Sequence, residues 1–116
     1  MTTNPSPELI AKVAERLRAL GDENRLRLLM RLREGPCSVS TLTEGLGLAQ
    51  PSVSKHLGML KQVGLVRARR EGNQMIYFVH DASIFDLCAV VCEGVVNHVR
   101  DQHAALGLAP ATRKED

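Results

Sequence analysis

Aromatic residues are scarce in this chain, which has two phenylalanines, one tyrosine and no tryptophan among 116 residues. Its core must therefore be aliphatic, and a chain of this length suits one small domain. No apolar run reaches the length of about 20 residues that a membrane-spanning helix needs. The polar opening MTTNPSPE also lacks the apolar core of a signal peptide. These absences predict a cytoplasmic protein with no membrane partner.

Cysteines are few in the whole chain, and acidic residues are absent from one basic segment. Three cysteines in a cytoplasmic chain are more typical of thiols, metal ligands or redox sensors than of structural disulfides. From Lys55 to Arg70 the chain has five basic residues and no acid, although its net charge is only +2. This local basic stripe, more than the total charge, indicates a nucleic-acid partner.

Apolar residues recur at helical spacing in four segments before any strand pattern begins. The first two helices are predicted at 7–20 and 23–33, and a third, capped by Ser38 or Ser40, is predicted to run to about Gly45. A fourth, at 51–63, opens with a proline and is followed by Gly64, a typical C-terminal signal. The last two, joined by a short glycine-containing turn, predict a helix-turn-helix.

The composition then changes to that of strands. Strand-forming residues fill LVRARR (65–70) and MIYFV (75–79), and the turn residues EGNQ separate them. This pattern predicts a β-hairpin over 65–79. Its arginines at the base, with Asn73 and Gln74 near the tip, make a wing that could reach a phosphate or a minor groove.

A final helix is predicted over 82–106, with Asp81 as its N-cap. Its first half is apolar on nearly every side, so it must be buried from two directions. A domain of this size cannot surround such a helix, and we therefore predict that it forms a symmetric dimer interface together with the first helix. Residues 1–106 are predicted to form one winged domain, and 107–116 a loose tail.

Polar side chains on the fourth helix suit a DNA groove. Short hydroxyls, an amide, a lysine and a histidine can bond to base edges and phosphates. Positively charged residues of the stripe would supply the salt-dependent phosphate affinity. A plain solvated helix face is the alternative, and the wing and the basic stripe argue against it. The candidate residues are Gln50, Ser52, Ser54, Lys55, His56, Arg67, Arg69, Arg70, Asn73 and Gln74.

Residues 9–99 resemble the ArsR/SmtB family of bacterial winged-helix repressors. The resemblance is in LGDENRLRLLMRL (20–32), AQPSVSKHLGMLKQVGLV (49–66) and REGNQMIYFV (70–79). It implies a mainly α winged helix-turn-helix of order α-α-α-α-β-β-α, homodimeric through the terminal helices, that binds a palindromic double-stranded operator. The chain departs from the family at Ala49, where a capping serine or threonine is frequent.

Two cysteines on the final helix suggest how such a repressor could be switched. Cys88 and Cys92 are four residues apart, so both thiolates can reach one soft metal or metalloid, whereas a relaxed disulfide does not fit this spacing. Cys37, near the helix-turn-helix, could add a third thiolate from either subunit. Three thiolates suit As(III), Cd(II) or Pb(II), and a fourth ligand would suit Zn(II).

The family's known sensor layouts leave other interpretations open. The arsenic-type Cys-x-Cys is absent, and the zinc-type pattern of the last helix is only echoed by DLC (86–88) and HVRD (98–101). Other members sense persulfide or peroxide with one cysteine near the helix-turn-helix and one on the last helix, as Cys37 with Cys88 or Cys92 could. A third interpretation is that these cysteines only fill apolar space.

An enzyme using a cysteine–histidine pair is disfavoured. No cysteine follows a strand at a sharp turn into a helix, and no glycine run suits an oxyanion hole. We therefore expect neither catalysis nor a small organic substrate. A winged-helix interaction module without DNA specificity is the remaining alternative class.

Overall fold

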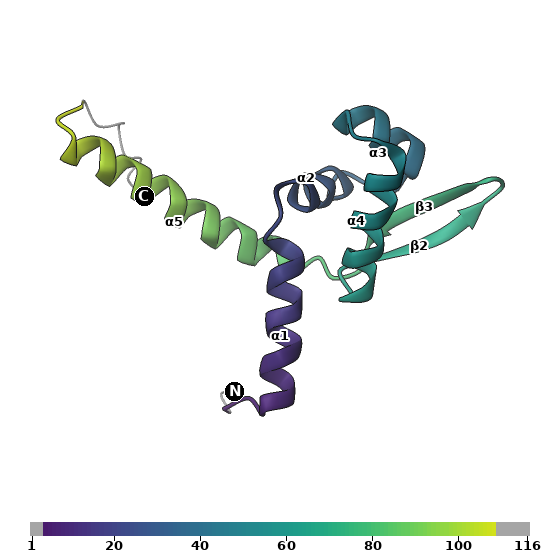
Figure 1. Cartoon of the computed structure of the whole chain (residues 1–116), viewed down its shortest axis with the longest axis horizontal. Coiled ribbons are helices and arrows are strands. Elements are labelled where there is room, and N and C mark those ends of the chain that lie inside the picture. Colours follow the sequence, from purple (N-terminus) through teal and green to yellow (C-terminus); the bar gives the residue numbers. More distant parts are fainter. Residues whose placement is uncertain (1–3, 109–116) are drawn as a thin grey trace. The chain divides into compact units, whose positions relative to one another are not determined.

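The computed structural model describes residues 4–108, which form five helices and three short strands (Figure 1). In chain order these are α1 (Pro7–Leu20), α2 (Glu23–Leu32), β1 (Cys37–Ser38), α3 (Val39–Leu46), α4 (Gln50–Gln62), β2 (Val66–Glu71), β3 (Gln74–Val79) and α5 (Ile84–Ala105). Apart from β1, this is the predicted winged helix-turn-helix order, and the fold prediction is confirmed. The contacts divide the chain after Ala82 into two units, which are described separately below.

The core of the first unit is aliphatic, as the scarcity of aromatic residues predicts. Its fully buried side chains are Leu28, Leu29, Leu32, Leu42, Val53, Leu57, Leu60, Leu65 and Val66. The apolar spacing of α2 in the sequence predicts that Leu26, Leu29 and Met30 point inward. Leu29 is fully buried, whereas Leu26 and Met30 are only half-buried. Leu28 and Leu32 are buried as well, because α2 contacts α1, α3, α4 and β3.

Side-chain caps start three of the four helices of this unit. Ser6 Oγ, Asp22 Oδ2 and Ser38 Oγ each accept a hydrogen bond of 3.1 Å from the backbone N–H three residues later. Ala49 precedes α4 and makes no such bond. The fourth helix, predicted at 51–63, thus spans Gln50–Gln62 and has no hydroxyl cap.

The three strands form one antiparallel sheet of order β1-β3-β2. Cys37 lies opposite Tyr77, and Ser38 opposite Ile76. A strand of two residues is too short to show an alternating pattern, which is why β1 was not predicted. Its pairing joins the start of α3 directly to the wing.

The wing is a tighter hairpin than the sequence suggested. The strands reach Glu71 and Gln74, which pair with each other, so only Gly72 and Asn73 form the turn. Gly72 has a φ of +62°, and no non-glycine residue in the described chain has a positive φ. A two-residue turn with glycine first and a positive φ only there is typical of type II′.

The second unit contains α5, described here by itself. Its N-cap is Ser83, so the prediction that Asp81 caps this helix is wrong, and Asp81 instead accepts a hydrogen bond from Arg16. Large apolar side chains remain exposed along it, namely Leu87, Val90, Val91, Val95, Val96 and Val99. Within residues 4–108 no helix combines the length and apolarity that crossing a membrane requires. Of the predicted tail 107–116, residues 109–116 lie outside the described residues.

Candidate DNA-binding surface

Helix α4 has one face buried in the core and the opposite face exposed to solvent. Val53, Leu57 and Leu60 are fully buried, because they recur at helical spacing against the core. The opposite side exposes Ser54 and Lys55. The exposed side therefore carries hydrogen-bonding and positively charged groups, as the sequence analysis predicted for a helix that contacts DNA.

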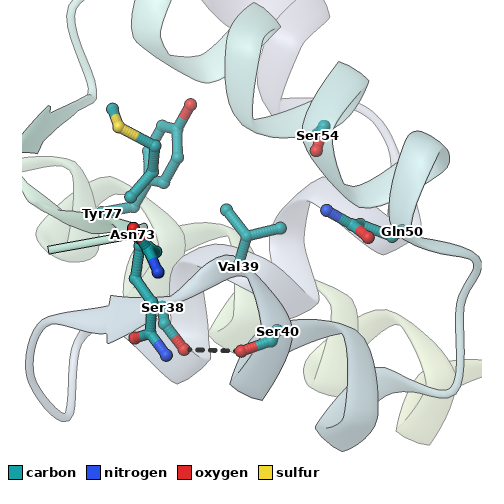
Figure 2. A pocket seen from close by; sticks show the side chains of 9 residues that line it. Ser38, Val39, Ser40, Gln50, Ser54, Asn73 and Tyr77 are labelled. Carbon is teal, nitrogen blue, oxygen red and sulfur yellow. Dashed lines mark hydrogen bonds between the residues drawn. The ribbon is translucent and has the colours of Figure 1, made fainter. Parts of the chain in front are cut away.

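A hollow of about 270 Å³ opens between the beginning of α3, the beginning of α4 and the wing. It is lined by Ser38, Val39, Ser40, Gln50, Ser54, Asn73, Gln74, Met75 and Tyr77. Figure 2 shows Gln50 and Ser54 on the α4 side, with Asn73 and Tyr77 across the hollow from them. Four of the predicted DNA-facing residues, Gln50, Ser54, Asn73 and Gln74, thus share one concave surface.

The other lining residues were not predicted as site residues. Ser38 is buried and its Oγ lies 3.2 Å from Ser40 Oγ and 2.9 Å from Thr41 Oγ1. The run of hydroxyl residues at the start of α3 was a usable signal for this part. Tyr77 and Met75 could have been found from strand alternation, because they lie on one face of β3.

The three wing arginines lie on two faces of the hairpin. Arg70 is paired with Met75, so its side chain shares the face that lines the hollow. Arg67 and Arg69 alternate to the other face. There Arg69 Nε contacts Glu71 Oε2 at 2.6 Å, and its guanidinium lies 5.4 Å from the centre of the Phe78 ring.

His56 is half-buried and packs against Arg25 of α2. Its Nδ1 lies 3.2 Å from Arg25 Nη1, a contact in which Nδ1 must accept. Arg25 Nε also donates to the Ala19 carbonyl at 2.6 Å, and Nη1 lies 3.4 Å from Met59 Sδ. His56 therefore connects α4 with the α1–α2 corner, and its DNA contact stays a prediction. The neighbouring Ser52 is half-buried as well.

Asp22, beside this cluster, carries the clearest electrostatic effect in the described chain. The backbone N–H of Arg25 bonds to its carboxylate and holds the pKa of Asp22 below the usual 3.8. The positive charge of Arg25 lowers this pKa further, while partial burial opposes it. The carboxylate is thus stabilised in its charged form as the cap of α2.

The three cysteines are free thiols in different surroundings. Cys37 is buried in β1, Cys88 is half-buried on α5, and Cys92 is exposed one turn further along that helix. In the described part of the chain, no group of three histidine, cysteine or acidic side chains is close enough to hold a metal ion. Cys88 and Cys92 share α5, and their predicted combination with Cys37 stays a prediction.

Helix α1 exposes an apolar face of its own. Leu9, Ile10, Val13 and Leu17 recur at helical spacing, and each keeps about half of its surface exposed. Both terminal helices therefore carry apolar surface of the kind that a partner protein buries.

The sequence of this chain is similar to those of known regulatory proteins. The sequence model of the bacterial regulatory protein arsR family matches residues 22–68. NmtR, an HTH-type transcriptional regulator of Mycobacterium tuberculosis, is 35% identical over 99 residues, which cover 85% of this chain and 78% of that protein. A probable mercury resistance operon repressor of Streptomyces lividans is 41% identical over 70 residues, covering 60% of this chain and 56% of that protein.

A solved structure extends the similarity to three dimensions. It is the solution structure of the homodimeric winged helix-turn-helix DNA-binding domain Mb0332 of Mycobacterium bovis, a possible ArsR-family transcriptional regulator. The two superpose with a TM-score of 0.72 at 30% identity, covering 88% of this chain and 97% of that one. The chain therefore belongs to the ArsR family of bacterial regulatory proteins, a family of DNA-binding transcriptional regulators and not of enzymes.

Proposed function

We propose that this protein is a cytoplasmic, homodimeric repressor that binds a double-stranded operator through α4 and the wing, and that an effector acting on its cysteine thiolates releases it. The observation that carries the DNA-binding part is the shared hollow. Gln50 and Ser54 of α4 line it together with Asn73 and Gln74 of the wing. The two elements can therefore engage one stretch of duplex at the same time.

The chemistry of this surface suits DNA. Its neutral amide and hydroxyl groups can exchange water for base edges or phosphate oxygens without desolvating a charge. Exposed Lys55, Arg67 and Arg70 add the positive charge that releases counterions from the duplex. Ser52, His56 and Arg69 complete the predicted contact set, although Ser52 and His56 are half-buried and Arg69 is paired with Glu71.

The exposed apolar faces of α1 and α5 support the homodimer. A two-fold axis would let each helix bury its apolar face against a second copy, as in the homodimeric relative from Mycobacterium bovis. Binding of a palindrome would place the two α4 helices about 34–36 Å apart, one turn of DNA. Operator affinity would then depend on how the dimer holds that spacing.

For the effector we propose a thiophilic metal or metalloid. Cys88 is half-buried, Cys92 is exposed, and the two are one turn apart on α5, which suits two thiolates on one soft ion such as As(III), Cd(II) or Pb(II). Cys37 would complete a three-thiolate set, and Zn(II) would need a fourth ligand. The mercury resistance operon named in the Streptomyces lividans relative supports this chemical class.

A thiol-redox signal is the second candidate, and the exposure of Cys92 favours it. An oxidant would reach this thiol directly, and Cys37 or a cysteine of a second copy would be its partner. Metal content and free-thiol titration of protein purified without reductant separate the two. Bound metal with three titratable thiols after its removal indicates the metal sensor, whereas fewer thiols and no metal indicate the redox sensor.

Binding to the protein's own upstream DNA tests the central proposal. We expect a preference for one site over scrambled DNA of equal length, with affinity falling steeply as salt rises. Cd(II) should lower that affinity, and Cys88→Ser should abolish the response without changing binding in its absence. Binding without sequence preference would instead indicate the winged-helix interaction module.

A further inference from the structure

The C-terminal end of α4 is held by a side chain from α1. Arg16 Nε and Nη2 both donate to the carbonyl oxygen of Val63, at 3.2 and 2.7 Å. Val63 is the C-cap of α4, and carbonyls at this end have no partner within the helix. A guanidinium there satisfies the carbonyl and complements the negative end of the helix dipole.

The same guanidinium binds a second segment. Arg16 Nη1 lies 2.9 Å from Asp81 Oδ2, and the two side chains are only 39% and 30% exposed, so solvent screens the pair incompletely. Asp81 stands two residues before Ser83, where the second unit of the chain begins. One arginine thus joins the end of α4 to the segment that leads into α5.

Backbone bonds bring the same two segments together. The N–H of His80 donates to the Leu65 carbonyl at 2.9 Å, directly after the α4 end. At Gly64, whose φ is +81°, an added Cβ would lie 3.1 Å from Arg16 Nη2. The guanidinium therefore sits closely against the turn that ends α4. We call this group of Arg16, Val63, Gly64 and Asp81 the α4-end junction.

Only arginine can make this arrangement from position 16. Its planar fork reaches two acceptors in fixed directions, whereas a lysine ammonium is a single point charge on a flexible stem. We infer that Arg16 is a positioning residue for operator recognition: it fixes the orientation of α4 relative to Asp81 and passes displacement of the α5 segment on to α4. The inference rests on the proposed function, because it concerns the same DNA-binding helix.

The test compares Arg16→Lys and Asp81→Asn with wild type and with Arg18→Lys, an exposed control on the same helix. The measured quantity is the ratio of affinity for the operator to affinity for scrambled DNA at one salt concentration. Arg16→Lys keeps the charge, so its affinity for scrambled DNA should stay at the wild-type value. We expect its operator affinity, and the ratio, to fall about tenfold.

Asp81→Asn separates coupling from simple capping. If Arg16 transmits position between the two segments, Asp81→Asn lowers the ratio in the same direction, and the double variant is no worse than the weaker single variant. A wild-type ratio in Asp81→Asn, with a loss only in Arg16→Lys, would reduce Arg16 to a cap of α4. Wild-type ratios in both variants would overturn the inference.

A measurement without DNA tests the inference independently of operator affinity. Hydrogen exchange at the amide of Leu65, which bonds to the Leu60 carbonyl at 3.0 Å, should accelerate in both variants and not in Arg18→Lys. Unchanged exchange would contradict the inference even if Arg16→Lys folds poorly and only Asp81→Asn can be studied. Failure of the proposed function would differ, because wild type itself would then show no operator preference.

Discussion

Arg69 and Arg70 are neighbours in sequence that the structure separates by role. The charge of Arg69 is compensated by Glu71 at 2.6 Å and its guanidinium lies near Phe78, whereas Arg70 lies on the face of the wing that lines the hollow. The sequence alone predicts phosphate binding for both arginines without distinction. Strand pairing gives a reason to expect unequal contributions.

We expect Arg70→Ala to weaken operator binding about tenfold and to reduce the slope of log affinity against log salt by about one. Arg69→Ala should change both quantities less, because a paired charge releases fewer counterions from the duplex. Fluorescence anisotropy over a salt series measures both variants. Equal losses would show that the Arg69–Glu71 pair opens on DNA.

Gly58 is an exposed glycine inside α4 that the fold does not require. It has no positive φ, and no neighbouring atom lies within 4 Å of the position that a Cβ would occupy. Gly58→Ala should therefore stabilise the fold by about 1 kcal/mol, measured by urea unfolding. If α4 lies against DNA, the added methyl group should also lower operator affinity. Greater stability with unchanged affinity would place Gly58 on a merely solvated face.

At the scale of elements, we expect the stability that the Asp22 cap gives to the start of α2 to depend on pH. The lowered pKa of Asp22 means that the folded chain favours the carboxylate, so this contribution to stability is complete above the usual 3.8 and is lost as pH falls through the folded value. Asp22→Asn keeps a cap acceptor and removes the titration. Between about pH 5 and pH 3 its unfolding midpoint should fall less than that of wild type. Glu34→Gln, at an exposed acid, is the matched control.

The elements with a strong local pattern were predictable. Helix α4 showed apolar residues at Val53, Leu57 and Leu60 and an ending glycine, and the hairpin showed two β-rich runs around a turn. Strand β1 had no such pattern, because its two residues become a strand only through pairing with Tyr77 and Ile76. The role of Asp81 was missed for a similar reason, since its partner Arg16 is 65 residues away.

The candidate DNA-binding surface also has one part that the sequence predicts and another that depends on how the elements pack. Gln50 and Ser54 were identifiable from the exposed side of one helix, but their meeting with Asn73 and Gln74 depends on how the wing packs beside α4. The spacing of Cys88 and Cys92 is a local property of α5. Whether Cys37 joins them is a property of the assembled molecule, which no segment of the sequence encodes alone.

At the scale of the whole molecule, the exposed apolar faces predict that function requires two copies. Val95 on α5 is 55% exposed in the single chain, so Val95→Lys should leave the fold of each chain intact and place a charge in the proposed interface. We expect it to be monomeric by light scattering at concentrations where wild type is dimeric. Gln102→Lys, at an exposed polar position of α5, adds the same charge and should stay dimeric.

Operator affinity then tests whether the dimer matters for DNA binding. Two linked recognition helices gain about a hundredfold or more over one, because the second half-site is bound intramolecularly. Val95→Lys should lose that factor on a palindromic operator and bind an isolated half-site as wild type does. A monomeric variant with wild-type operator affinity would mean that a single α4 and wing supply all of the recognition, and would contradict the two-fold arrangement proposed for α1 and α5.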